Sequence, residues 1–230
     1  MVYKLFSRKL AQSLARCLLC GGASGEVGIC SACTQELPAL GRGCRYCALP
    51  LAAAKDNICA ACLQRPPALK KISAAWQYAY PINHLIQHFK YHRDLAAGHS
   101  LIQLAARQLG LPEDMPDILT PVPLHWRRYW QRGYNQAQLI ASGLGQNWCL
   151  PVDLQLLRKT TSTKTQSQLS RNQRLKNLSD SFAVRGEISG AHIGLVDDVV
   201  TTGATLEIIT RQLLTAGAKQ VSAFVLARTP

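Results

Sequence analysis

The pattern of hydrophobic and polar positions divides the chain near residue 66. After that point short apolar runs alternate with longer segments of helical period. The apolar runs predict strands over residues 72–80, 117–122, 192–197 and 221–227. The helical segments cover residues 82–91, 95–109, 135–146 and 205–216. Strands that alternate with helices are typical of a parallel sheet flanked by helices, so the sequence predicts an α/β fold.

The residues before this region follow another pattern. Cysteine is concentrated there, and the segment ends at the stiff sequence Arg65-Pro66-Pro67. We therefore expect two domains, residues 1–66 and residues 67–230. At the start of the chain, apolar residues at helical spacing predict a short amphipathic helix: Val2, Leu5, Phe6, Leu10 and Leu14.

Eight of the nine cysteines form four C-x-x-C pairs: Cys17/Cys20, Cys30/Cys33, Cys44/Cys47 and Cys59/Cys62. Two intervening residues let one turn direct both thiolates at a single ion, and two such pairs complete a tetrahedral zinc site. Eight ligands therefore predict two zinc ions. Disulfides would not persist in a reducing cytoplasm, and the regular paired spacing fits zinc better than an iron–sulfur cluster.

The cysteine-rich segment is also an internal repeat, because each half carries two C-x-x-C pairs. We favour one zinc within residues 17–33 and one within 44–62 over a cross-braced arrangement of alternate pairs. Four thiolates leave no open coordination position, so both ions are expected to be structural. The ninth cysteine, Cys149, lies between Trp148 and Leu150 and is expected in the core.

Composition excludes several classes of protein. With 230 residues, 47% of them hydrophobic, the chain can build one substantial core and a smaller module. No charge-free run is apolar enough to span a bilayer, and basic residues interrupt the N-terminal segment where a signal peptide would need an apolar stretch. We expect a cytoplasmic protein without a transmembrane segment.

The formal net charge of +13 is unevenly distributed, with +8 carried by residues 118–176. A basic cluster of this kind attracts phosphates and predicts a nucleic acid or a phosphate-rich small molecule as partner. Part of the excess lies in a Ser/Thr/Gln-rich stretch that suits a lid over bound phosphates. Aromatic residues interleave with arginines over residues 126–134, which suits either stacking on single-stranded DNA or a packed aromatic cluster.

The most informative stretch is residues 193–205, in which an apolar strand ends in Asp197 and Asp198. A hydroxyl-rich turn then opens a helix, with the sequence Val199, Val200, Thr201, Thr202, Gly203, Ala204 and Thr205. Backbone N–H groups at a helix start, with hydroxyls beside them, can surround a phosphate monoester. Adjacent carboxylates can accept hydrogen bonds from vicinal hydroxyls, so the stretch predicts a ribose 5-phosphate site.

This stretch resembles the signature of type I phosphoribosyltransferases, which bind 5-phosphoribosyl 1-diphosphate (PRPP). Further segments resemble the ComF family: residues 90–94, 121–125 and 132–137, together with Gln168, Arg171, Arg174 and Asn177. A double zinc ribbon at the N-terminus also belongs to that family's pattern. The resemblance covers almost the whole chain and implies a type I phosphoribosyltransferase fold, PRPP bound with Mg²⁺, and a role in natural competence. Partners implied in this way are imported single-stranded DNA and competence or DNA-processing proteins.

The resemblance also implies roles for individual residues. Asp197, Asp198 and Arg132 would be catalytic, and the residues from Val199 to Thr205 would hold the phosphate of PRPP. Pro123 and Leu124 would belong to the pyrophosphate loop, with Arg127 and Lys164 as further PRPP-binding residues. Two functions remain open at this point. The protein is either an enzyme that transfers phosphoribosyl to an unidentified acceptor, or a non-catalytic PRPP sensor and DNA or protein adaptor.

Overall fold

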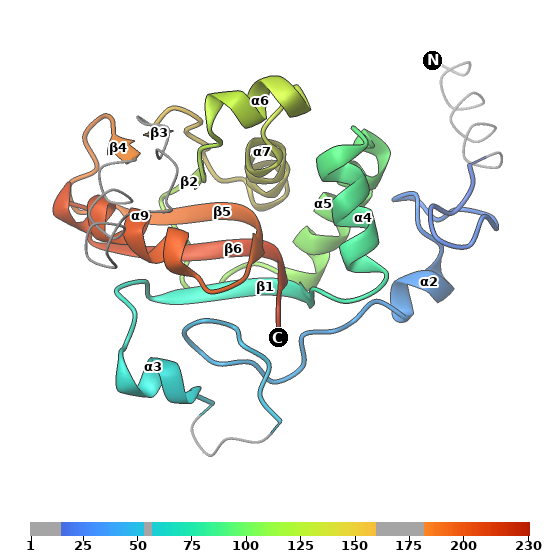
Figure 1. Cartoon of the computed structure of the whole chain (residues 1–230), viewed down its shortest axis with the longest axis horizontal. Helices are drawn as coiled ribbons and strands as arrows, with labels where there is room; N and C mark the ends of the chain where they lie inside the picture. The colour runs from blue at the N-terminus through green and yellow to red at the C-terminus, as the bar shows by residue number, and fades with distance from the viewer. Residues whose placement is uncertain (1–14, 53–56, 160–181) are drawn as a thin grey trace, which may run out of the picture.

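A parallel four-stranded sheet forms the centre of the molecule. The computed structural model describes residues 15–52, 57–159 and 182–230. The strands lie in the order β1-β6-β5-β2 (Figure 1), and all neighbours are parallel. Their bounds are β1 Lys71–Gln77, β2 Ile118–Pro121, β5 His192–Val200 and β6 Gln220–Arg228. The predicted parallel sheet is therefore confirmed.

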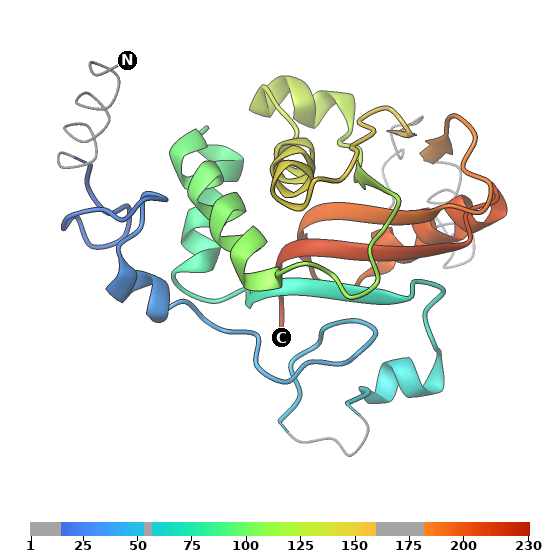
Figure 2. The same ribbon diagram turned by 180° about the vertical axis from the view of Figure 1, so that it is seen from behind.

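Helices cover both faces of this sheet. The helices α4 (Ile82–Tyr91), α5 (Leu95–Leu109) and α7 (Gln136–Trp148) pack on one face, and α9 (Ala204–Thr215) packs on the other. Beside α9, the short strands β3 (Leu157–Lys159) and β4 (Phe182–Val184) pair antiparallel. Figure 2 shows the α4–α5–α7 layer from behind.

The alternation of side chains along the strands explains the two hydrophobic cores. In β6, Val221, Ala223 and Val225 pack towards α9, whereas Phe224 and Leu226 pack towards α5 and α7. Successive side chains of a strand point to opposite faces, so a strand covered on both sides is apolar at nearly every position. This is why the β6 sequence reads as one continuous apolar run.

Side-chain caps fix where the longer helices begin. Asp94 accepts a hydrogen bond from the Ala97 N–H at the start of α5, and Asn135 accepts one from the Ala137 N–H at the start of α7. Each cap satisfies a backbone donor that has no partner within the helix. The predicted bounds of α4 and α5 agree with the structure, and α7 extends two residues beyond its predicted end.

The cysteine-rich segment lies against the sheet and its helices rather than apart from them (Figure 1). It contains the short helices α2 (Ser31–Gln35) and α3 (Ala60–Gln64). The Ile72 N–H donates to the Tyr46 carbonyl at 2.8 Å, and the Gln77 N–H donates to the Pro38 carbonyl at 3.0 Å. Both hydrophobic cores also include residues from this segment, such as Ile29 in one and Ala48 in the other. The division of domains at residue 66 stays a prediction.

Three further expectations were wrong in detail. Residues Trp126–Arg132 form a helix, α6, that the pattern did not predict. Strand β5 continues past Asp197 to Val200 because its last residues still pair with β6. Cys149 is exposed and ends α7 in the left-handed conformation, with φ of 55°, so it is not a core residue.

Other expectations lie outside the described residues. These are the N-terminal amphipathic helix, the greater part of the basic lid stretch, and Lys164 with Gln168, Arg171, Arg174 and Asn177. Among the helices of the described part of the chain, none has the length and apolar character needed to cross a membrane.

Candidate functional site

Two carboxylates lie near the carboxyl end of β5. Asp197 Oδ1 accepts a hydrogen bond from the Asp198 N–H at 2.8 Å. Asp198 Oδ2 lies 2.8 Å from the Nζ of Lys90, which comes from α4. Both partners of this ion pair are largely shielded, with side-chain exposures of 17% for Lys90 and 13% for Asp198. The packing of α4 against the sheet therefore brings a cation to the second carboxylate.

The first carboxylate titrates differently from an ordinary aspartate. Burial, together with the adjacent charge of Asp198, raises the pKa of Asp197 to about 7. The Asp198 N–H and the Lys90 charge oppose this shift without cancelling it. Near neutral pH the carboxyl of Asp197 is therefore partly protonated. A bound divalent cation or a set of hydroxyl donors would favour the fully ionised form.

The loop after β5 has the geometry of an anion site. Gly203 adopts a left-handed conformation with φ of 76° and caps α9 without a side-chain hydrogen bond. Backbone N–H groups of the first helical turn therefore point towards the loop, where they favour negative charge. Asp197 and the residues from Val199 to Leu206 line a cavity of about 50 Å³ here. We call residues 199–205 the phosphate loop, and it contains no Lys or Arg.

A second, larger cavity of about 280 Å³ begins at the carboxylates and extends to the end of β2. Its far wall includes His125, whose Nδ1 accepts a hydrogen bond from the Arg127 N–H at 3.2 Å. The proton of the neutral ring therefore resides on Nε2, and this buried atom has no partner among the described residues. Burial, with the charges of Lys159, Arg127 and Arg128, lowers the pKa of His125. A residue of the cavity wall thus carries a neutral, buried N–H donor.

Other donors converge on the same wall. The Oε1 of buried Gln136 accepts a hydrogen bond from Arg132 at 3.1 Å, and its Nε2 lies near the Tyr134 hydroxyl but forms no hydrogen bond of regular geometry among the described residues. Lys159 and Arg128 also line the cavity, and burial together with the charge of Arg128 lowers the pKa of Lys159. Buried donors without acceptors cost free energy unless a ligand supplies the acceptors. This wall therefore fits a polyanion.

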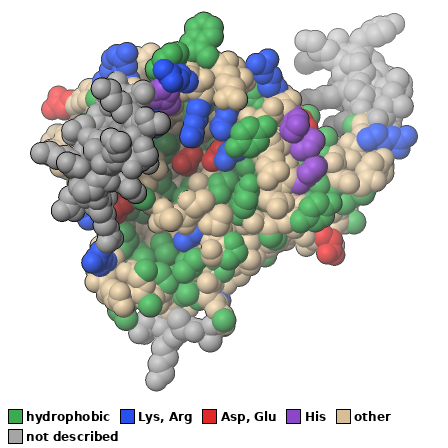
Figure 3. Space-filling model, in the orientation of Figure 1, with side chains coloured by type: hydrophobic (Ala, Val, Ile, Leu, Met, Phe, Trp, Pro, Cys, Tyr) green, Lys and Arg blue, Asp and Glu red, His purple; other side chains and the backbone are tan. Residues whose placement is uncertain are grey.

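The cavity has opposite charges on its two sides. Figure 3 shows acidic side chains at the floor of a hollow, with Lys and Arg side chains beside and above them. The acidic side is formed by Asp197 and Asp198 and the basic side by Lys159, Arg128 and Arg132. An arrangement of this kind can bind a ligand with hydroxyl groups at one end and several phosphate oxygens at the other.

The structure brings most of the residues from the sequence prediction together. Asp197, Asp198, Arg132, Pro123, Leu124 and Thr205 line the larger cavity, and residues 199–205 line the smaller one. Arg127 is not among the lining residues of either cavity, and its guanidinium carbon lies 5.3 Å from the ring centroid of Trp126. The assignment of individual roles to these residues stays a prediction.

Sequence reasoning left several cavity residues without a committed role, among them Lys90, His125, Arg128, Gln136 and Lys159. The ion pair of Lys90 with Asp198 joins residues far apart in the chain, which no local pattern can predict. Lys90, His125 and Gln136 did carry a signal, since all three lie within segments that resemble the ComF family. The ion pair of Lys90 and the environment of the His125 and Gln136 nitrogens became evident only from the structure.

Eight cysteines form two tetrads. In the first cysteine tetrad (Cys17, Cys20, Cys30, Cys33) and in the second (Cys44, Cys47, Cys59, Cys62), the sulfurs all lie within 4.8 Å of one another. Zinc bound tetrahedrally at about 2.3 Å from each sulfur needs S···S separations of about 3.8 Å. The Cys20–Cys30 and Cys47–Cys59 sulfurs are 3.8 Å and 3.7 Å apart. The donor sets therefore fit structural zinc, and the predicted sequential pairing is confirmed.

The titration of the cysteines agrees with a metal site. Burial raises the pKa of Cys17 and Cys44, but hydrogen bonds from backbone N–H groups outweigh it and lower both values to about 6. In the opposite direction, hydrogen bonding to the neighbouring Cys30 and Cys20 sulfurs raises the pKa of Cys33 to about 12. Four thiolates cannot coexist so closely without a cation, and a bound zinc ion supplies that charge.

Comparison with protein families gives two matches within the chain. Residues 131–230 match the phosphoribosyl transferase domain, and residues 14–63 match the double zinc ribbon domain. The fold is accordingly that of a type I phosphoribosyltransferase preceded by a zinc-ribbon segment. A solved purine phosphoribosyltransferase from Pyrococcus horikoshii aligns with a TM-score of 0.36 at 19% identity, over 56% of this chain and 70% of that chain.

Full-length relatives define the family. The chain is 36% identical to the DNA utilization protein YhgH of Escherichia coli, over 90% of this chain and 93% of that protein. It is 31% identical to competence protein F of Haemophilus influenzae, over 93% of this chain and 96% of that protein. The chain belongs to the competence protein F, or ComF, family.

Proposed function

We propose that this protein binds PRPP together with Mg²⁺ and transfers its phosphoribosyl group to an acceptor. The observation that carries the proposal is the charge arrangement of one cavity. Asp197 and Asp198 lie on one side and cations with unpartnered donors on the other. PRPP combines two ribose hydroxyls with a pyrophosphate and a 5-phosphate, so its parts match these features one by one.

Each part of PRPP has a matching group. The ribose hydroxyls would donate to Asp197 and Asp198, and the 5-phosphate would accept hydrogen bonds from the N–H groups of the phosphate loop. The pyrophosphate would accept from the Nε2 groups of His125 and Gln136, beside Arg128 and Lys159. The two unpartnered donors would gain the acceptors that they lack.

Transfer breaks the bond between ribose C1 and the pyrophosphate oxygen, so negative charge grows on the leaving group. Arg132 and Arg128 would stabilise that charge, and Asp197 and Asp198 would face the ribose as it becomes positive. No covalent protein nucleophile is required. Mg²⁺ would be held by Asp197 and Asp198 with the substrate oxygens and would add positive charge beside the leaving group.

Calorimetric titration with PRPP and Mg²⁺ tests the pocket. In the double variant Asp197→Asn/Asp198→Asn, affinity should fall about 100-fold, because two charge-assisted interactions are lost. Glu187→Gln is a matched control, since Glu187 is an exposed carboxylate outside both cavities. Equal affinity in the double variant and the control would contradict the assignment.

A second measurement separates an enzyme from a sensor. Pyrophosphate release from PRPP is followed with and without a pool of nucleobases, amines and single-stranded DNA. Release that depends on one acceptor supports the transferase and defines its substrate class. Tight PRPP binding without release from any of these acceptors supports the alternative, in which the protein senses PRPP as an adaptor.

A role in handling DNA is favoured by a separate observation, the exposed aromatic surface of α6. The exposed fractions of Trp126, Tyr129 and Trp130 are 60%, 46% and 80%. The packed aromatic cluster is thus the weaker interpretation for these three residues, and exposed rings beside Arg127 and Arg128 suit stacking with single-stranded bases. The relatives named DNA utilization protein and competence protein F agree with this role. The protein would encounter both imported single-stranded DNA and PRPP in the cytoplasm.

Fluorescence anisotropy with a labelled single-stranded oligonucleotide tests the surface. The variant Trp126→Ala/Trp130→Ala should bind the oligonucleotide about tenfold or more weakly, because each stacked base contributes about 1–3 kcal/mol. Leu111→Ala removes an exposed apolar side chain from another surface and should leave binding unchanged. Equal losses in the two variants would remove α6 from the interface.

A further inference from the structure

A single buried arginine connects the second cysteine tetrad to the phosphate loop. Arg228 is the last residue of β6 and is only 6% exposed. Its Nε donates to the carbonyl of Cys47 at 3.0 Å, while its Nη1 donates to the carbonyls of Thr201 and of Val200, the latter at 3.4 Å. One guanidinium therefore holds the backbone of a zinc ligand and the backbone of the phosphate loop.

In the described part of the chain, Arg228 forms no ion pair with a carboxylate within 4.0 Å. An unpaired buried cation is costly, so a counter-charge at either end of its contacts would stabilise it. Zinc bound by four thiolates carries a net charge of −2, and a bound phosphate carries a similar charge. Arg228 lies between the places where these two anions would be.

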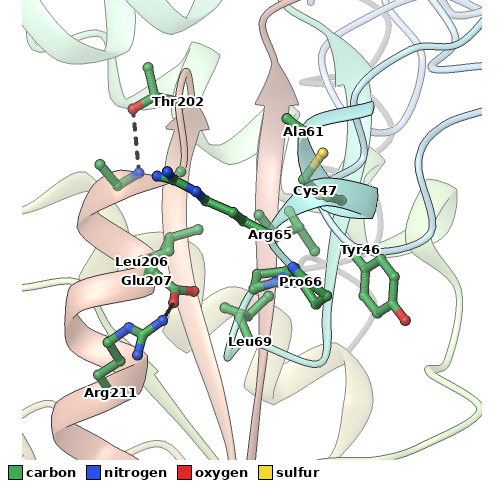
Figure 4. Close-up of a pocket in the computed structure, with 15 residues that line it drawn as sticks. Tyr46, Cys47, Ala61, Arg65, Pro66, Leu69, Thr202, Leu206, Glu207 and Arg211 are labelled. Atoms are coloured by element: carbon green, nitrogen blue, oxygen red, sulfur yellow. Dashed lines mark hydrogen bonds and ion pairs between the residues drawn. The ribbon is translucent and has the colours of Figure 1, made fainter. Parts of the chain in front are cut away.

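The space between the two sites is a cavity of about 600 Å³. The second tetrad contributes Cys47 and Cys62 to its wall, and the phosphate loop contributes Thr202 and Gly203. Figure 4 shows Arg65, from the end of α3, pointing across this cavity towards Thr202 and the start of α9. A second cation from the zinc-binding segment thus approaches a loop that has none of its own.

We propose that Arg228 is a positioning residue that couples zinc at the second cysteine tetrad to PRPP binding at the phosphate loop. Zinc fixes the turn of residues 44–47 and hence the Cys47 carbonyl, which orients the guanidinium and through it the loop backbone. The inference rests on the proposed function, because it assigns the phosphate loop to PRPP. Coupling between binding sites is reciprocal, so PRPP must also strengthen the retention of zinc.

Zinc release provides a readout that needs no catalytic activity. The zinc-loaded full chain is mixed with a chromophoric chelator in the presence and absence of PRPP and Mg²⁺. PRPP should slow the release of one of the two zinc ions at least about fivefold, the lower end of typical coupling. The Cys17→Ser/Cys20→Ser variant, which keeps the second tetrad, should retain the slowed phase. If PRPP no longer slows zinc release in this variant, the inference is overturned.

Variants of the arginine test the route. Arg228→Met should bind PRPP about tenfold more weakly, and PRPP should no longer slow its zinc release. Arg228→Lys keeps the charge but cannot form the same set of hydrogen bonds, so it covers the case in which Arg228→Met does not fold. In the Arg228→Lys variant, the effect of PRPP on the rate of zinc release should be reduced by at least half. Arg211→Met is the control, because Arg211 lines the cavity between the second tetrad and the phosphate loop but pairs with Glu207 at 2.6 Å.

The outcomes separate this inference from the proposed function. If calorimetry detects no PRPP binding, both fail together. If PRPP binds but zinc release is unchanged, or is slowed equally in the Arg228 variants, the coupling is overturned and the proposed function stands. If the Asp197→Asn/Asp198→Asn variant still shows slowed release, PRPP acts from outside the pocket and the coupling route is wrong.

Discussion

The two cysteine tetrads have the same local structure and different surroundings. In each, the third cysteine caps a five-residue helix by accepting a hydrogen bond from the N–H of the fourth. The first tetrad lies against α5, where Gly28 approaches the Ser100 side chain and Glu26 pairs with Arg107. The second lies against β1 and the phosphate loop, through Tyr46, Cys47 and Arg228.

The difference shows that two copies with the same set of cysteine ligands can make different contacts with the rest of the protein. Both copies fit zinc equally well, but only the second shares a hydrogen-bonded arginine with the phosphate loop in the described part of the chain. We therefore expect the first zinc to stabilise the fold and the second to affect ligand binding as well.

The largest effect is expected when one tetrad at a time loses zinc. The variants Cys44→Ser/Cys47→Ser and Cys17→Ser/Cys20→Ser should each bind one zinc ion instead of two. PRPP affinity should fall on the order of 50-fold in the former, because the loop loses its anchor, and by less than about twofold in the latter. Zinc content and calorimetric affinity measure both quantities. Equal losses of affinity in the two variants would show that the tetrads do not differ in this way.

A change of pH should have a smaller effect on PRPP affinity. This effect should arise from the carboxylates and not from either tetrad. Since the pKa of Asp197 is raised to about 7, this carboxyl is protonated below neutrality and must release its proton to bind Mg²⁺ with PRPP. PRPP affinity should therefore fall about tenfold from pH 8 to pH 6, because the ionised fraction of one group with a pKa near 7 falls by about that factor.

Asp197→Asn is the control for this pH dependence, because PRPP itself titrates in the same range. The variant should bind more weakly at pH 8 and lose most of the dependence, whereas the Cys17→Ser/Cys20→Ser variant should keep all of it. A pH profile that is unchanged in Asp197→Asn would assign the proton to the ligand or to another group.

Local patterns predicted much of the fold, and long-range contacts account for what they missed. The helical spacing of apolar residues and the Asp94 cap are both local features of the sequence, so the bounds of α5 could be predicted closely. Helix α6 buries none of its residues and therefore has no apolar face to detect. The C-x-x-C spacing gave the cysteine pairs, and the internal repeat favoured the sequential tetrads over a cross-braced arrangement. In contrast, the contacts of Lys90 with Asp198 and of Arg228 with Cys47 depend on tertiary packing, which no local pattern encodes.

The smallest effect is expected at the surface contact of the first tetrad. Arg107 Nη2 lies 3.6 Å from Glu26 Oε2, and the two side chains are 61% and 83% exposed. Solvent screens such pairs, so Arg107→Met should change the free energy of unfolding by less than about 0.5 kcal/mol, measured by urea denaturation. PRPP affinity and both zinc ions should be unaffected. A loss of PRPP affinity in this variant would mean that the first tetrad also communicates with the cavity, through α5 and the neighbouring α4 that carries Lys90, and the contrast between the two copies would then fail.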